Sequence, residues 1–285
     1  MKKCFTRMLK TELYKAFHNN YFRISLLFGC SCALFSGAFK IRNYAKLKAD
    51  MEIISGNPMW QMASLYNYWI GGESGTLGYA CFFFLLPLLA VLPYGWSYCE
   101  ESRKNYLKLP VIYGGRRQYF LAKYIAAFLA GGTAIIIPMI ANLLMIACVV
   151  PAYLPTMEYG LYYPVSHGSL WSELFYTRPT VFVICYLLLD FVFAGLFAAL
   201  AYAISIFIHN KIAVILLPFI LTLILHHSRT ILQYRVYKEI SPLHFLHSTC
   251  VENNADAGII LTELLILFVV SIGIVLFAGM RYEDI

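Results

Sequence analysis

Histidine and cysteine recur near the end of the sequence at a spacing that could bind a metal. His244, His247 and Cys250 are each three residues apart, and His226-His227 lies nearby in the chain. Imidazole nitrogens and thiolates are zinc ligands, but this set matches no recognised zinc pattern. We therefore expect no metal site, and interpret the stretch as a segment lying on the outer surface.

A second candidate for chemistry is Gly72-Glu73-Ser74-Gly75, which resembles the Gly-x-Ser-Gly of rhomboid intramembrane proteases. A serine nucleophile needs a base within hydrogen-bond reach. The last apolar run, 258–279, contains no histidine. The motif is better explained as a flexible turn and helix N-cap before the next apolar run, and we expect the chain not to be an enzyme.

Two acidic residues inside apolar runs are candidates for a substrate path. Asp190 lies near the middle of the run 180–208, where an ionised carboxylate costs roughly 2.5–3.5 kcal/mol. It should be protonated, paired with a Tyr or Ser of a neighbouring helix, or part of a substrate or proton path. Glu263 follows the start of the run 258–279, where a negative charge stabilises a helix N-terminus. Its alternative role is contact with a cation or substrate at the outer mouth.

The elements that position these residues are membrane helices. Hydrophobic residues make up 60% of the 285 residues and charged residues 13%, more apolar surface than a soluble domain can bury. Several apolar runs approach the roughly 20 residues that a helix needs to cross a bilayer. We predict an all-α polytopic membrane protein, a single domain over 1–285, with six transmembrane helices at about 22–39, 77–96, 121–150, 180–208, 212–227 and 258–279.

Residues 1–20 precede the first span and show helical periodicity. One face carries the apolar side chains and the other the basic ones: Phe5, Met8, Leu9, Leu13, Ala16 and Phe17 against Lys2, Lys3, Arg7, Lys10 and Lys15. Such a helix is expected to lie in the headgroup plane. The simpler alternative is a positively charged tail that only directs insertion.

The distribution of basic residues predicts the orientation. Lysine and arginine are concentrated in 1–23 and 103–123, which places both termini and the loop 97–120 on the cytoplasmic side of the plasma membrane. The basic run from Lys40 to Lys48 opposes this orientation, because it would lie outside.

Two segments of the sequence resemble type-2 ABC transporter permeases. The first is Leu9-Lys-Thr-Glu-Leu-Tyr-Lys15, directly before the first span. The second comprises Glu100-Glu101-Ser-Arg-Lys-Asn-Tyr-Leu-Lys-Leu-Pro110 and Gly115-Arg-Arg-Gln-Tyr-Phe-Leu-Ala-Lys123, similar to the family's cytoplasmic loop between spans two and three. The likeness covers the whole chain in span number and loop placement.

The resemblance implies a permease subunit of an ATP-driven exporter that moves a peptide, drug or other hydrophobic compound by alternating access. It implies a second permease subunit, identical or homologous, and a separate ABC ATPase that holds ATP and Mg. The residues implied to couple to the ATPase are Glu100, Glu101, Arg103, Lys104, Tyr106, Leu107 and Leu109. Those implied for the interfacial helix are Glu12, Tyr14 and Lys15.

The sequence itself agrees that any ATPase is a separate chain, because it contains no Gly-x-x-x-x-Gly-Lys-Ser/Thr motif. We expect no cofactor on this chain, and membrane lipid rather than nucleic acid around it. The loop 97–120 has a plainer interpretation as a solvated basic loop facing anionic lipid.

Two other functions are compatible with the sequence. The predicted outer segments are rich in aromatic residues: Tyr66, Tyr68, Trp69, Tyr159, Tyr162, Tyr163 and Trp171. They favour either a membrane-interface belt or a folded surface that binds a peptide or lipid, as in a non-transporting sensor or immunity protein for an antimicrobial peptide. A channel or proton-coupled carrier, in which Asp190 is indispensable, is the third possibility.

Overall fold

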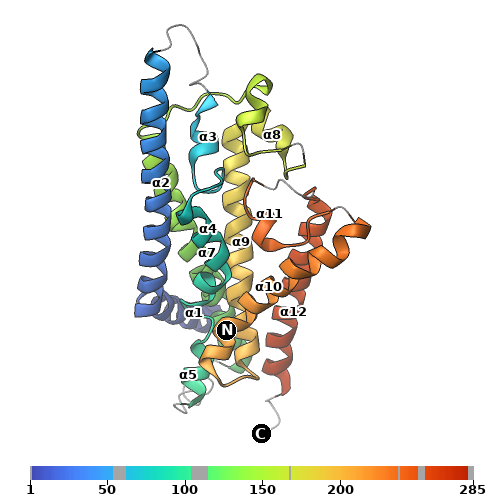
Figure 1. Cartoon of the computed structure of the whole chain (residues 1–285). Helices are drawn as coiled ribbons and strands as arrows, with labels where there is room; N and C mark the ends of the chain where they lie inside the picture. Colours follow the sequence, from blue (N-terminus) through green and yellow to red (C-terminus); the bar gives the residue numbers. More distant parts are fainter. Residues whose placement is uncertain are drawn as a thin grey trace.

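The computed structural model describes residues 2–53, 62–103, 115–166, 168–236, 238–249 and 254–281. Within these ranges the chain is almost entirely helical, and its β structure is limited to one bridge between Lys238 and Asn254. The longer helices are α1 (Lys2–Phe17), α2 (Asn20–Ile53), α4 (Leu77–Val91), α7 (Arg116–Ala147), α9 (Pro179–Ser205), α10 (Lys211–Val236) and α12 (Ala257–Arg281). Figure 1 shows α2, α4, α7 and α9 side by side as an elongated bundle.

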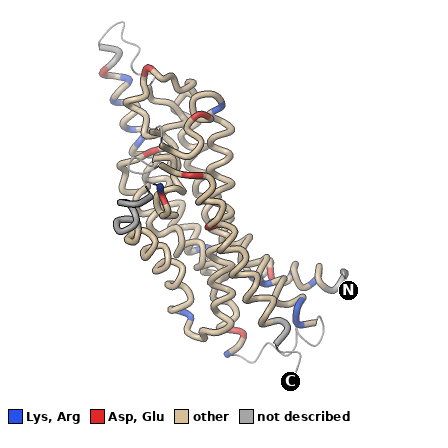
Figure 2. The backbone as a smooth tube through the Cα atoms, turned by 90° about the vertical axis from the view of Figure 1, so that its right-hand side faces the viewer, with Lys and Arg blue, Asp and Glu red and all other residues tan. Residues whose placement is uncertain are grey.

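The prediction of a helical membrane protein is confirmed. Five helices, α2, α7, α9, α10 and α12, are long and apolar enough to cross a membrane. Along most of their length the backbone carries neither acidic nor basic residues (Figure 2). Many of their large apolar side chains are exposed, as expected of helices that face lipid; examples are Leu27, Leu188 and Ile266.

The predicted span 77–96 corresponds to a shorter helix, so the count of six spans is not confirmed. Helix α4 has 15 residues, which gives a length of only about 22 Å. It ends at Val91 because Pro93 has no N–H to bond to Leu89 O. Ser25 of α2 donates to that carbonyl instead, at 2.7 Å. Turns over 92–96 then lead into α5 (Ser97–Arg103).

Several other predicted boundaries were wrong. Helix α2 continues to Ile53, so much of the segment predicted to be an outer loop, 40–76, is helical. The basic residues in Lys40–Lys48 are good helix formers, and a helix can extend past the apolar zone into water. Helix α10 similarly extends beyond residue 227, to Val236, whereas α9 ends at Ser205 before reaching 208.

The centre of the bundle depends on close contact between α4, α7 and α9. A Cβ atom at Gly131 of α7 would lie 2.8 Å from Ala90 O and 3.0 Å from Ala194 O. A Cβ at Gly195 of α9 would lie 2.9 Å from Phe128 O. Any side chain at these glycines would force the helices apart, so the seam between the three helices requires glycine.

Helix α1 lies across the base of the bundle, at a steep angle to α2 (Figure 1). Residues 2–17 are helical, with Ala16 fully buried and Glu12 only 3% exposed. The short helices α3 (Leu65–Tyr68) and α8 (Ser172–Thr177) lie at the opposite end. The molecule thus has two distinct ends, and the base is the one that contains α1 and α5.

Candidate functional site

A buried carboxylate joins three elements at the base of the bundle. Glu101 lies on α5, and its side chain is only 16% exposed. Its Oε1 is 3.2 Å from Lys15 Nζ on α1, and its Oε2 is 2.8 Å from Lys123 Nζ on α7. The Tyr119 hydroxyl on α7 also donates to Oε2. Glu101, in the predicted coupling segment, thus forms ion pairs with lysines of two other helices.

Lys123 is the most deeply buried member of this group, with an exposed fraction of zero. Besides Glu101 it reaches Ser97 Oγ at 3.4 Å. Its ammonium also lies over the rings of Tyr119 and Tyr94, at 5.4 and 5.6 Å from their centroids. A buried ammonium without a counter-charge is strongly destabilising, so Glu101 is needed to keep this lysine inside the protein.

Glu12 continues the chain of charges into α1. Its Oε1 is 2.9 Å from Lys15 Nζ, and its Oε2 accepts a hydrogen bond of 2.5 Å from the Tyr94 hydroxyl. Acid and base therefore alternate in the order Glu12, Lys15, Glu101 and Lys123. We call these four residues the basal junction.

The charges of the basal junction support one another. Burial alone would raise the pKa of the Glu101 carboxyl, but Lys123, Tyr119 and Lys15 stabilise the carboxylate and hold the pKa below its ordinary value. Burial would lower the pKa of Lys15, but Glu101 and Glu12 raise it above its ordinary value. Both groups are therefore ionised at neutral pH.

Asn19, in the turn between α1 and α2, fixes α1 beside the junction. Its Nδ2 donates to Ala16 O and Pro93 O, each at 2.8 Å. Its Oδ1 accepts from Phe22 N at 2.7 Å and so caps α2. One side chain thus connects the end of α1, the start of α2 and the turn after α4.

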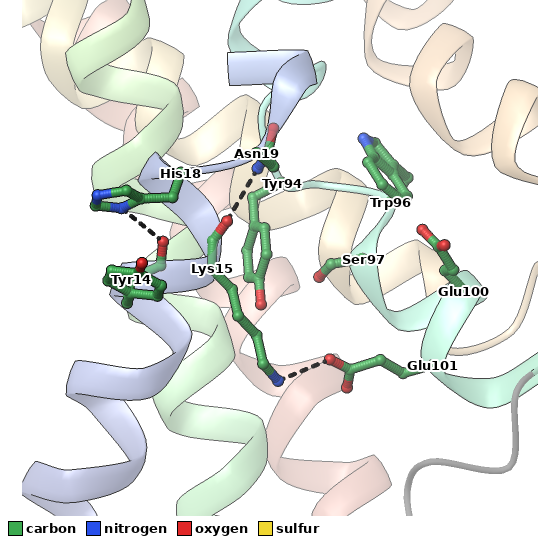
Figure 3. Close-up of a pocket in the computed structure, with 9 residues that line it drawn as sticks. All are labelled: Tyr14, Lys15, His18, Asn19, Tyr94, Trp96, Ser97, Glu100 and Glu101. Carbon is green, nitrogen blue, oxygen red and sulfur yellow. Dashed lines mark hydrogen bonds and ion pairs between the residues drawn. The ribbon is translucent and has the colours of Figure 1, made fainter. Parts of the chain in front are cut away.

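Two cavities open beside the basal junction. The first has a volume of about 390 Å³ and is lined by Tyr14, Lys15, His18, Asn19, Tyr94, Trp96, Ser97, Glu100 and Glu101. Figure 3 shows the Lys15 side chain reaching from α1 to Glu101 across it. The second, of about 360 Å³, is lined by Tyr21, Cys99, Glu100, Arg103 and Lys211. Glu100 borders both.

The turn that begins α10 also contacts this region. Lys211 Nζ lies 3.3 Å from the Trp96 ring centroid and 3.9 Å from that of Tyr21, a cation–π arrangement. Arg103 Nη2 donates to His209 O at 3.0 Å. Helix α5 is therefore attached to α1 and α7 on one side and to the α9–α10 turn on the other.

The structure brings together residues of the predicted interfacial helix and of the predicted coupling segment. Glu12 and Lys15 of the first set and Glu101 of the second form one network. Tyr14 is 65% exposed instead, and its ring stacks on that of His18 with the centroids 4.1 Å apart. The remaining loop residues of the prediction, Lys104, Tyr106, Leu107 and Leu109, lie outside the described residues.

Sequence reasoning missed Lys123 and Tyr119 as members of the site. Both residues lie in the segment 115–123 that carries the family resemblance, but the predicted coupling residues all lie between Glu100 and Leu109. A lysine just inside a predicted span, 121–150, was nevertheless a signal, because a charge at membrane depth needs a partner.

A second buried acid lies nearer the opposite end of the bundle. Glu73 is fully buried, and its Oε2 is 3.0 Å from Lys40 Nζ of α2. The hydroxyls of Ser36 and Thr76 donate to its Oε1. Thr76 is also the N-cap of α4, since it accepts from Tyr79 N at 3.1 Å. The Gly72–Gly75 motif therefore precedes the cap and contributes a structural acid.

The two candidates for a substrate path, Asp190 and Glu263, lie on different helices, α9 and α12. Asp190 is fully buried in α9, and neither carboxylate oxygen has a hydrogen-bond partner among the described residues. Glu263 lies in the second turn of α12. No described hydrogen bond or ion pair joins the two.

Three of the histidines lie close together. His226 and His244 stack at 4.9 Å, and His247 Nδ1 lies 2.7 Å from Thr249 Oγ1. The described residues contain no group of three His, Cys, Asp or Glu side chains able to hold a metal; Cys250 lies outside them. Burial, with His244 close by, lowers the pKa of His247 to about 3.

Most of the aromatic residues predicted to lie in outer segments pack into the protein. Trp69 is fully buried, and Tyr66 and Tyr163 are 9% and 7% exposed. Tyr159 and Trp171 pack against the same core, whereas Tyr162 is 52% exposed. Their main role in the structure is therefore to close the end of the bundle opposite α1.

Comparison with known proteins finds no family model that matches this chain and no curated protein with significant similarity to it. Its function must be inferred from its residues and their geometry.

Proposed function

We propose that this chain is the permease subunit of an ATP-driven exporter in a bacterial plasma membrane. It moves a peptide, drug or other hydrophobic compound by alternating access. The observation that carries the proposal is the attachment of α5 to α1 and α7 through Glu101, which pairs with Lys15 and Lys123.

This attachment provides a route for mechanical coupling. Separating Glu101 from the fully buried Lys123 leaves an uncompensated charge and costs about 3–5 kcal/mol, whereas the partly exposed Lys15 pair contributes about 0–1 kcal/mol. A force on α5 therefore moves α7 with it, and α1 more weakly. Since α7 packs on α9 through Gly131 and Gly195, a displacement of α7 reaches the centre of the bundle.

The distribution of charge supports an orientation with the base in the cytoplasm. The basic residues of α1 and the start of α7 lie at the base, where both termini also lie (Figures 1 and 2). The positive-inside rule then places α1, α5 and both termini on the cytoplasmic side. Helix α1 lies in the plane of the inner headgroups with its apolar face on the bundle.

The energy source in this proposal is a separate ABC ATPase that binds ATP and Mg, since the sequence lacks a phosphate-binding loop of the Walker type. The ATPase contacts the segment 97–120 from below. A second permease subunit completes the transporter.

The test is reconstitution of the chain with its ATPase in liposomes, followed by measurement of ATP hydrolysis as candidate peptides and drugs are added. We expect stimulation by cargo, and its loss in Glu101→Gln with the complex still assembled. Glu173→Gln is the matched control, because Glu173 is exposed on α8 at the opposite end. A Glu101→Gln complex with normal cargo stimulation would contradict coupling through the junction.

Orientation has its own test. A membrane-impermeant amine reagent applied to intact cells should leave Lys104 and Lys108 unlabelled. Labelling of either residue from outside would place the segment on the wrong side for an ATPase.

The alternative function is a peptide-binding sensor, which needs an exposed apolar surface on its outer side. Trp69 and Tyr163 of the outer segments are buried, whereas Met157 and Leu161 are 81% and 99% exposed. Stable binding of an antimicrobial peptide without any effect on ATP hydrolysis would favour the sensor over the exporter.

A further inference from the structure

Asp190 differs from the other acids with little exposure. Glu12, Glu73 and Glu101 each pair with a lysine, and the buried Glu239 accepts a hydrogen bond from Ser241 N. Asp190 is fully buried, and neither of its oxygens has a hydrogen-bond partner among the described residues. A buried polar group in this condition requires an explanation beyond packing.

The position of Asp190 along α9 places it near the seam of the bundle. Residues four apart lie on the same face of a helix, so Asp190 shares its face with Ala194. A Cβ atom added at Gly131 of α7 would lie 3.0 Å from the carbonyl oxygen of Ala194 on α9 and 2.8 Å from that of Ala90 on α4. Asp190 is therefore one turn away from the point where α4, α7 and α9 meet.

The two helices across this seam are interrupted by proline. Pro138 in α7 and Pro87 in α4 cannot donate to the carbonyl groups four residues earlier. Such positions allow membrane helices to bend. The seam beside Asp190 is therefore closely packed, and both helices across it contain a proline at which they can bend.

Among the described residues, no side chain donates a hydrogen bond to either carboxylate oxygen of Asp190. On the elements packed against α9, Lys123 is paired with Glu101 and Lys211 lies over Trp96. Helices α3 and α4 contain no charged residue, and Glu263 of α12 makes no described contact with Asp190. Tyr186, one turn away on α9, donates its hydroxyl hydrogen to Leu170 O at 3.3 Å.

We propose that Asp190 is a proton-binding site that carries a proton while the seam between α4, α7 and α9 is closed and releases it to water when the seam opens. In the closed bundle the neutral acid avoids the cost of an ionised carboxylate, roughly 2.5–3.5 kcal/mol at membrane depth. In contact with water, an aspartate titrates near its ordinary value of about 3.9 and ionises at neutral pH.

The release step is a simple acid dissociation. The carboxyl O–H bond breaks, the electron pair stays on the carboxylate, and the proton passes to water; closing the seam reverses the step. The step needs no ATPase, so this proposal goes beyond the proposed function and stands apart from it. In an exporter each opening of the bundle would release one proton per subunit, and each closing would take one up.

Infrared spectroscopy of the full chain in liposomes at neutral pH tests the protonation state directly. We expect a carbonyl band of a protonated carboxylic acid that is lost in Asp190→Asn and retained in Glu173→Gln. Thermal unfolding of each variant shows whether it is folded. If Asp190→Asn instead loses carboxylate intensity and leaves the acid bands unchanged, Asp190 is ionised and the proposal is overturned.

Transfer to D₂O tests the release. We expect the Asp190 acid band to shift on deuteration faster than the backbone amides of α7 and α9 exchange, because seam opening is a smaller event than unfolding. Exchange of the acid only together with those amides would overturn release by seam opening. Neither measurement uses the partner ATPase, so a failed coupling experiment and a failed proton experiment are separate outcomes.

Discussion

Two acidic side chains pair with lysine, Glu101 at the base of the bundle and Glu73 nearer the opposite end. The two pairings have different consequences. Glu73 is fully buried and held by one lysine, Lys40 of α2, and by two hydroxyls close to the start of α4. Glu101 is shared by lysines from two different helices and borders a cavity. The Glu73 site fixes two neighbouring helices, whereas the basal junction connects elements that have space beside them to move.

The difference shows which acid can transmit motion. A carboxylate that accepts hydrogen bonds from neighbouring hydroxyl groups keeps those side chains in fixed positions. A carboxylate that joins its own helix to two others next to open volume can keep them joined while their positions change. The comparison therefore supports a structural role for Glu73 and the proposed coupling role for Glu101, and the predictions below test this distinction.

The largest effect is expected from Glu101→Gln. Loss of this carboxylate leaves Lys123 buried without a counter-charge, which should reduce the free energy of unfolding by about 3–5 kcal/mol. The measurement is chemical or thermal unfolding of the purified chain. The double variant Glu101→Gln, Lys123→Met should recover much of the loss, because it removes the unpaired charge. A double variant as unstable as the single one would contradict this account.

Asn19→Ala should have the next largest effect. It removes an N-cap, which alone contributes about 1 kcal/mol, and the hydrogen bonds that join α1 to the turn after α4. We expect a loss of about 2 kcal/mol in unfolding free energy and faster proteolysis of α1. Asn210→Ala is the control, because Asn210 caps only α10, through Ile212 N.

Glu73→Gln should destabilise the chain less than Glu101→Gln. The amide can keep hydrogen bonds to Ser36 and Thr76, and Lys40 is 17% exposed and can reach water. We expect a loss of about 1–2 kcal/mol and unchanged cargo-stimulated ATP hydrolysis. A Glu73→Gln variant that is stable but uncoupled would invalidate the distinction between the two acids.

Acid should weaken the basal junction selectively. The pKa of Glu101 is lower in the folded protein than in the unfolded chain, so its contribution to stability is present above the unfolded value and is lost as the pH falls through the folded value. Stability of the wild type should therefore decline below about pH 4, more steeply than that of Glu101→Gln. Equal pH dependence in the two proteins would contradict the depressed pKa.

The smallest effect is expected from Lys15→Met. This lysine is 34% exposed, and partly exposed ion pairs contribute only about 0–1 kcal/mol. Stability should change little, whereas coupling to α1 should weaken, as measured by cargo-stimulated ATP hydrolysis. The result would separate the part of the junction that stabilises the fold from the part that connects α1.

The sequence by itself determined the class of the protein and most of its helices. Apolar runs longer than a soluble core can accommodate require lipid around them, and each predicted span lies on a helix of the structure. Boundaries were harder to predict. Helix α4 ends early because Ser25 can satisfy the carbonyl that Pro93 leaves without a donor, and this contact comes from another helix.

Only the tertiary structure decided which charges meet. Glu12, Lys15 and Glu101 were recognised separately, but nothing in their spacing shows that one carboxylate holds both Lys15 and Lys123. Likewise the sequence showed that Asp190 is unusual, whereas its lack of a described partner depends on the packing around α9. Local patterns determine helices because helical hydrogen bonds are local, but the energy of a charge depends on burial and on partners that lie far away in the chain.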